Sequence, residues 1–150
     1  MSKSPSHDFI DTMEQWFAKF PALPKNATET LVKITPVLAL IFGILGILAA
    51  IGGLGILTAT SPLSVLGGRE SMSAYGTGFI ASIFYLAASA LLLAAYPGVK
   101  AHKVQGWKLL FWSETVSLVG GVVGMTSIVS ALIGALIGFY ILFQIKSYYK

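Results

Sequence analysis

The chain has 150 residues, of which 55% are hydrophobic and 11% are charged, and it contains no cysteine. Soluble domains carry about 25% charged residues, so this composition excludes an ordinary water-facing surface over much of the chain. The lack of cysteine excludes disulfides, thiolate metal sites, iron–sulfur clusters and thiol catalysis. The net charge of +4 does not indicate nucleic-acid binding, because the basic residues stand at the ends of apolar runs, as membrane topology requires.

Residues 1–25 are expected to form a cytoplasmic tail that contains an amphipathic helix over residues 6–20. Apolar side chains recur there at helical spacing and form one stripe, and Pro21 ends the helix. We expect this helix to lie in the membrane interface; the alternative is a helix that docks on a partner protein. The stripe consists of Phe9, Ile10, Met13, Trp16, Phe17 and Phe20.

Residues 26–150 are predicted to form one bundle of transmembrane helices. An uncharged apolar run of about 18 residues can cross the hydrocarbon core of a bilayer, and the runs 34–57 and 74–96 meet that length. The stretch 109–145 would exceed about 50 Å as one helix, so we expect it to fold back near residues 124–127. The prediction is an all-α membrane protein with a four-helix bundle, whose spans are 34–57, 74–96, 107–125 and 128–146. Between the first two spans, residues 58–74 are expected to form an outer loop with a short helix that begins at Pro62.

The basic residues predict the orientation of the bundle. With four spans, Arg69 is the one basic residue on the outer side, and the other nine of the ten Lys and Arg residues lie on the inner side. We therefore expect both termini in the cytoplasm and the spans in a plasma (inner) membrane. The inner loop carries Lys100, Lys103 and Lys108, which topology alone explains; binding of anionic lipid headgroups is the alternative.

Rows of small residues predict close contacts between the spans, because helices in lipid associate through van der Waals contact between closely approaching backbones. These rows either hold a monomeric bundle together or contact another subunit, in a homo-oligomer or a larger membrane complex. They consist of Gly43, Gly46, Ala50 and Gly53 in the first span, Gly121 and Gly124 in the third, and Ser130, Gly134 and Gly138 in the fourth.

Glu114 is the one ionisable residue well inside a predicted span, about 9 Å along the helix from Lys108. It shares a helix face with Ser117, so we expect it to point into the bundle or an interface, where Lys33 could pair with it. One interpretation is a proton- or cation-binding group on a transport path. The other is a buried polar anchor that fixes helix register, and the isolation and shallow depth of Glu114 favour it.

The sequence contains no catalytic constellation, no metal-ligand spacing and no cofactor motif, so no enzyme activity, metal or cofactor is expected. The leading hypothesis is a non-enzymatic membrane protein that acts as a structural or accessory subunit. The alternative is a small channel or transporter that uses Glu114. A sealed bundle would favour the first hypothesis, and a polar cavity that reaches Glu114 would favour the second.

Overall fold

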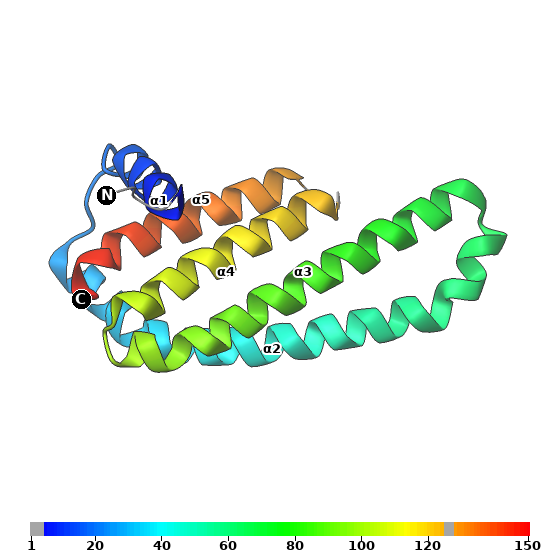
Figure 1. Ribbon diagram of the computed structural model, residues 1–150, viewed down its shortest axis with the longest axis horizontal. Helices are drawn as coiled ribbons and strands as arrows, with labels where there is room; N and C mark the ends of the chain where they lie inside the picture. The colour runs from blue at the N-terminus through cyan, green and yellow to red at the C-terminus, as the bar shows by residue number, and fades with distance from the viewer. Residues whose placement is uncertain (1–4, 125–127) are drawn as a thin grey trace.

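The computed structural model describes residues 5–124 and 128–150, and the regular structure within these residues is entirely helical (Figure 1). It comprises α1 (Pro5–Phe17), α2 (Lys25–Leu66), α3 (Gly68–Lys100), α4 (Val104–Val123) and α5 (Ile128–Ile145), followed by a 3₁₀ turn over Lys146–Tyr148. The all-α prediction is thereby confirmed for the described residues. The predicted fold-back at residues 124–127 lies outside them apart from Gly124, which caps α4.

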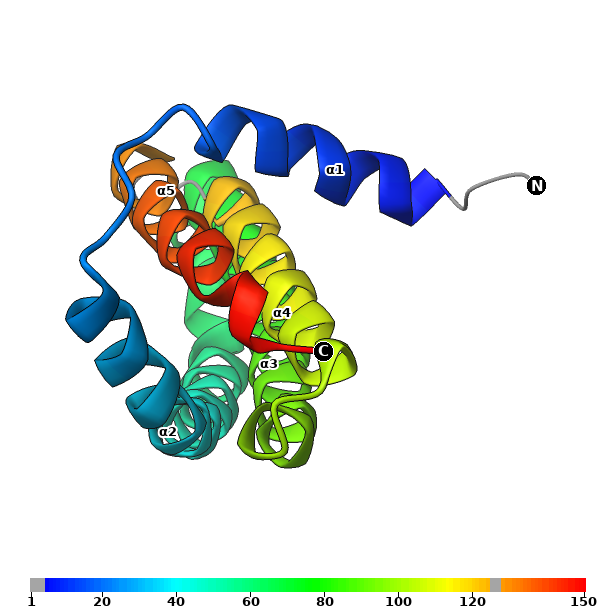
Figure 2. The same cartoon turned by 90° about the vertical axis from the view of Figure 1, so that its left-hand side faces the viewer.

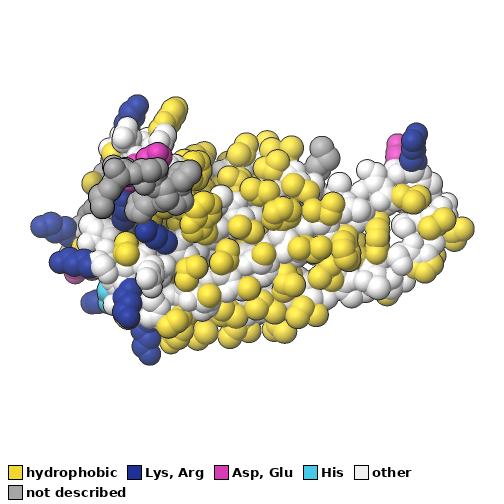
Figure 3. All heavy atoms as spheres, in the orientation of Figure 1, with side chains coloured by type: hydrophobic (Ala, Val, Ile, Leu, Met, Phe, Trp, Pro, Cys, Tyr) yellow, Lys and Arg dark blue, Asp and Glu magenta, His cyan; other side chains and the backbone are white. Residues whose placement is uncertain are grey.

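Three helical segments in the described part of the chain are long and apolar enough to cross a membrane: Lys25–Leu66, Gly68–Lys100 and Ile128–Tyr148. They suggest a membrane-spanning protein. The 42 residues of α2 correspond to about 63 Å at about 1.5 Å per residue, twice the thickness of a hydrocarbon core of about 30 Å. Hydrophobic side chains cover the sides of the molecule, whereas most Lys and Arg side chains gather at one end (Figure 3).

The prediction of an outer loop with a separate short helix is wrong, because α2 continues through Pro62 to Leu66. Proline removes a backbone donor and leaves the carbonyl four residues earlier without its helical partner. Here that carbonyl belongs to Thr58, and the hydroxyl of Ser61 donates to it at 2.9 Å. The chain then reverses at Gly68, whose φ of +77° suits glycine.

The α2–α3 hairpin extends beyond α4 and α5 (Figure 1). Gly53 of α2 lies opposite Ser82 of α3, and a Cβ at Gly53 would be 3.7 Å from the Ser82 hydroxyl. Ser82 also lines a groove together with Gly124 at the end of α4, so Gly53 lies near the level at which α4 ends. From Gly53, α2 continues for about 20 Å before it ends at Leu66.

The best-buried part of the bundle lies near the basic end, where α3, α4 and α5 meet. Val99, Trp107, Phe111 and Ile145 are the largest fully buried side chains of the described residues. The indole N–H of Trp107 donates to the Leu142 carbonyl at 2.7 Å, which links α4 to α5 inside this core.

Two glycines allow α3 and α4 to cross with their backbones in contact. A Cβ built on Gly98 would lie 2.7 Å from the Gly106 Cα. A Cβ on Gly106 would overlap the backbone of Gly98 and Val99. The small-residue rows found in the sequence do not include this pair, although it forms the closest backbone-to-backbone contact between helices among the described glycines.

Helix α1 packs across the ends of α4 and α5 (Figure 2). Ile10 and Phe17 are buried there, and the Phe17 ring stacks on Phe143 with centroids 5.3 Å apart. Glu14 forms an ion pair with Lys146 of the 3₁₀ turn. Part of the predicted apolar stripe therefore contacts the chain's own bundle. The other side chains of the stripe are more exposed: Phe9 is 45%, Trp16 66% and Phe20 53% exposed. Met13 is half-buried.

The C-terminus is fixed to the turn between α3 and α4. The Lys150 N–H donates to the His102 carbonyl at 3.0 Å, and Tyr149 beside it is buried. Burial raises the pKa of Tyr149, and the nearby Thr35 hydroxyl offsets only part of this effect. Because Thr35 already donates to the Leu31 carbonyl at 2.6 Å, the Tyr149 oxygen has no partner with hydrogen-bond geometry in the described residues.

Candidate functional site

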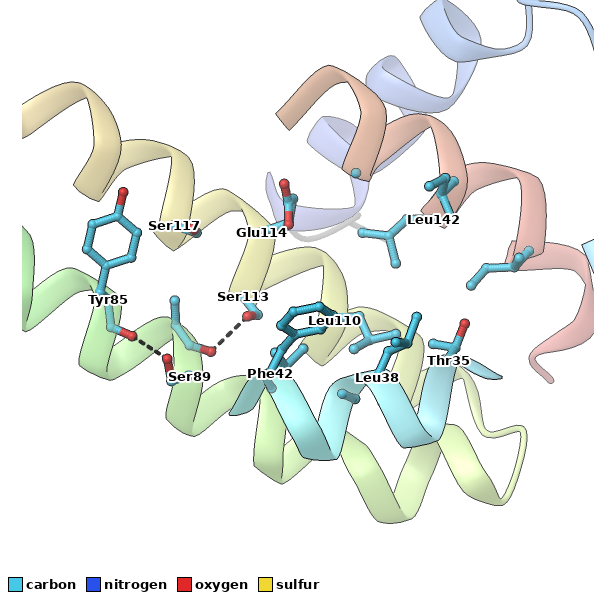
Figure 4. Close-up of a pocket in the computed structure, with 16 residues that line it drawn as sticks. Thr35, Leu38, Phe42, Tyr85, Ser89, Leu110, Ser113, Glu114, Ser117 and Leu142 are labelled. Atoms are coloured by element: carbon cyan, nitrogen blue, oxygen red, sulfur yellow. Dashed lines mark hydrogen bonds between the residues drawn. The ribbon is translucent and has the colours of Figure 1, made fainter. Parts of the chain in front are cut away.

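A cavity of about 430 Å³ lies among α2, α3, α4 and α5 (Figure 4). Each of the four helices contributes side chains to its lining, so the cavity depends on the assembled bundle. Most of these side chains are apolar. The polar ones within the described residues are Thr35, Tyr85, Ser89, Ser113, Glu114 and Ser117.

Glu114 of α4 lines this cavity and reaches across to Gly138 of α5. A Cβ built on Gly138 would lie 2.5 Å from Oε1 of Glu114, so the missing side chain of Gly138 is what makes room for the carboxylate. Among the described residues, Glu114 accepts no hydrogen bond and forms no ion pair. Lys33, the predicted partner, is exposed on α2 and does not line the cavity. The structure therefore does not bring Lys33 to Glu114.

The polar side chains of the cavity differ in whether their hydroxyl protons are already used. Thr35 donates to the Leu31 carbonyl, as noted above. The hydroxyl of Ser89 donates to the Tyr85 carbonyl at 2.8 Å, and that of Ser113 donates to the Ala88 carbonyl at 2.7 Å (Figure 4). These groups offer the cavity only oxygen lone pairs.

Ser117 and the Tyr85 hydroxyl make no hydrogen bond within the described residues, so their protons remain available to a ligand. Ser117 lies three residues after Glu114 on α4, which places the two on one face of the helix. The Tyr85 hydroxyl lies 3.5 Å from the position of a Cβ on Gly121, the next turn of α4. Carboxylate and hydroxyls thus follow one face of α4 over about two turns.

Glu114, Ser117 and Tyr85 also line a second cavity of about 150 Å³ on the side of Gly134. They are the residues that the two cavities share, so they form the boundary between them. Tyr85 borders in addition a groove of about 460 Å³ that runs along α2 and α3 toward their turn. The sequence analysis assigns no role to Tyr85. The feature that could have indicated one is a phenol hydroxyl within an otherwise apolar run.

The predicted small-residue rows are distributed over different contacts. On α2, Gly43 lies against Leu93 of α3, and a Cβ there would be 3.3 Å from the Leu93 nitrogen. Gly46 lies against Ser89, so this row faces α3. Gly121 faces α5, where a Cβ would be 2.8 Å from the Ala131 Cβ.

The remaining small-residue positions and the lysines of the predicted inner loop range from buried to exposed. A Cβ on Gly134 would meet nothing within 4 Å in the described structure, because this position borders the second cavity. Among the others, Ala50 is buried, Gly53, Gly124 and Lys108 are half-buried, and Ser130, Lys100 and Lys103 are exposed.

The polar chemistry of the cavity depends on a few side chains. It offers one carboxylate and two free hydroxyl protons, and no histidine or lysine lines it among the described residues. No group of three or more His, Cys, Asp or Glu side chains that could hold a metal ion occurs in the described part of the chain. Comparisons with protein families, with curated proteins and with solved structures find no match to this chain. Function is therefore inferred from the geometry of the cavity.

Proposed function

We propose that this protein is a small, non-enzymatic membrane transporter or channel in which Glu114 binds a proton or a cation. The observation that carries this proposal is the cavity of about 430 Å³ that reaches a carboxylate without a partner in the described chain. A sealed bundle would have favoured a purely structural role. The cavity is mainly apolar and so differs from the polar cavity expected for a transport path, but it reaches Glu114, and this carboxylate supports the transport hypothesis.

We propose that α4 is a fourth span beside the three apolar segments. Its 20 residues give a length of about 30 Å, and it packs between α3 and α5 (Figure 1). Helix α1, the C-terminus and the α3–α4 turn lie at the end where basic side chains gather (Figures 1 and 3). The positive-inside rule then puts this end in the cytoplasm, and Arg69 in the first turn of α3 at the outer side of a plasma (inner) membrane.

Glu114 would act by being neutralised. An ionised carboxylate among apolar walls is costly unless a counter-charge, hydrogen bonds or water compensate it. A proton or a bound cation removes that cost, and its release restores the charge. Because Glu114 lies at the boundary between two cavities, the bound species can be received from one cavity and delivered to the other when the bundle moves.

The test is flux of protons and of monovalent cations into liposomes that contain the purified protein. We expect flux with the native protein, loss of flux in Glu114→Gln, and native flux in Glu70→Gln, which removes an exposed carboxylate at the far end of the hairpin. Absence of flux in the folded native protein, or equal flux in Glu114→Gln, would overturn the transport proposal.

A second candidate function is a structural or accessory subunit, alone as a homo-oligomer or within a larger complex. One outward feature favours it: the exposed Trp16 of α1, which suits an interfacial anchor or a docking contact. Native mass spectrometry from nanodiscs tests it. An oligomer that Trp16→Ala converts to monomers would support this function, and a native monomer would count against a homo-oligomeric role.

A further inference from the structure

We infer that the Glu114 cavity binds a monovalent organic cation with an apolar body, which reaches it sideways from the bilayer between α2 and α5. This inference rests on the proposed binding role of the cavity and names its ligand class. Three properties of the cavity lead to it: its charge, its walls and the side on which it is open.

The charge of the lining selects for cations. Glu114 is the one acidic side chain among the described residues that line the cavity, and no Lys, Arg or His lines it. Most Lys and Arg side chains gather at one end of the molecule (Figure 3). A ligand with one positive charge would therefore be matched by one negative charge, and an anionic ligand would leave two like charges in apolar surroundings.

The walls select for an apolar body. Large aliphatic and aromatic side chains come from every helix that surrounds the cavity: Leu38, Phe42, Leu92, Leu110 and Leu142. A bare metal cation requires several oxygen ligands that converge on one point, whereas the described lining offers one carboxylate and hydroxyl oxygens that are spread over α2, α3 and α4. An organic cation places its charge at Glu114 and buries its remaining surface against these side chains. The volume of about 430 Å³ falls in the range of about 300–1,000 Å³ that is typical of small-molecule sites.

The cavity is closed on one side and open on another. On the α3–α4 side, the hydrogen bond from Ser113 to the Ala88 carbonyl joins the two helices (Figure 4). On the α2 side, Leu38 and Phe42 line the cavity and are nonetheless 39% and 57% exposed. The rim is therefore apolar and belongs to a helix long and apolar enough to span a membrane. A ligand that passes this rim comes from the hydrocarbon rather than from water.

The test uses the full chain in lipid nanodiscs and two probes of the same shape and opposite charge, tetraphenylphosphonium and tetraphenylborate. After subtraction of partitioning into empty nanodiscs, we expect saturable binding of the phosphonium and none of the borate. Glu114→Gln should weaken phosphonium binding by at least about tenfold, because a desolvated charge pair is lost. Glu70→Gln should bind as the native protein does.

A second pair of variants tests the side from which the ligand arrives. Leu38→Trp adds bulk at the rim and should weaken or slow phosphonium binding several-fold. Leu48→Trp adds the same bulk at another exposed position of α2 that does not line the cavity, and it should leave binding unchanged. Equal effects of these two substitutions would overturn access between α2 and α5.

The outcomes separate this inference from the transport proposal. Saturable phosphonium binding that depends on Glu114, without flux, keeps the ligand class and overturns transport. Flux that depends on Glu114, without phosphonium binding or with equal binding of the borate, overturns the ligand class alone. Neither flux nor binding in a folded protein overturns both.

Discussion

The close approach of the α3 and α4 backbones at Gly98 and Gly106 leads to one prediction: Gly106→Ala should destabilise the bundle strongly. A methyl group at this position would overlap the backbone of Gly98 and Val99 on α3. Side chains can change rotamer to relieve a clash, but backbone atoms cannot. The two helices must therefore separate where α3 and α4 cross.

The size of the effect follows from the geometry. Non-bonded carbon atoms prefer separations of about 3.5–4.0 Å, so the crossing must open by about 1 Å or more. This opening disturbs the neighbouring fully buried side chains Val99 and Trp107. Overpacking of a well-packed core costs about 1–3 kcal/mol, and a clash with backbone belongs at the upper end. We expect a loss of about 3 kcal/mol for Gly106→Ala.

The assay is reversible unfolding in mixed micelles with increasing denaturing detergent, followed by tryptophan fluorescence and circular dichroism. Trp107 lies directly beside the crossing and reports on it. The matched control is Gly52→Ala on α2, where a Cβ would meet nothing within 4 Å; it should be neutral or slightly stabilising, by up to about 1 kcal/mol, because alanine is the better helix former. Native stability of Gly106→Ala, or an equal loss in both variants, would refute the close crossing.

Three further predictions use the same assay. Ser113→Ala removes a buried hydrogen bond to the Ala88 carbonyl, which keeps its partner within α3, so it should cost about 0.5–1.5 kcal/mol; a native midpoint would contradict the bond. Glu14→Gln breaks the ion pair with Lys146, whose two side chains are partly exposed, and should cost about 1 kcal/mol or less, with a smaller effect at high salt. Burial raises the pKa of Tyr149 from 10.0, so the folded state favours the neutral phenol; stability is full below pH 10 and falls as the pH rises above it. Tyr149→Phe should remove this alkaline loss without a cost at pH 7, and a large cost at pH 7 would show that the hydroxyl has a partner.

The turn between α2 and α3 shows how local signals can be partly right. Gly67 and Gly68 mark the end of a helix in the sequence, and the chain does reverse there. The sequence predicts that a new helix begins at Pro62, because serine before proline is typical of an N-cap followed by the first helical residue. The Ser61 hydroxyl compensates the carbonyl that Pro62 leaves free, and a pattern of residue types does not reveal such a bond.

The N-terminal helix illustrates a different limit. Spacing of apolar residues identifies one face of α1, but an apolar face suits lipid, a partner protein or the chain's own bundle equally well. The structure buries Ile10 and Phe17 against α4 and α5 and leaves Trp16 exposed. Contact of Trp16 and Phe20 with lipid stays a prediction.

The sequence by itself determined that the described chain is helical, that its long helices are apolar, and that Glu114 is an acid within an apolar run. These properties depend on the composition and periodicity of neighbouring residues. Composition decides whether a segment favours lipid or water, and periodicity indicates a helix. Only the tertiary structure decided that Gly138 makes room for Glu114, that Tyr85 and Ser117 border it, and that Lys33 does not reach it. Contacts of this kind join helices far apart in the chain, and they depend on how the faces of all the helices fit together at once.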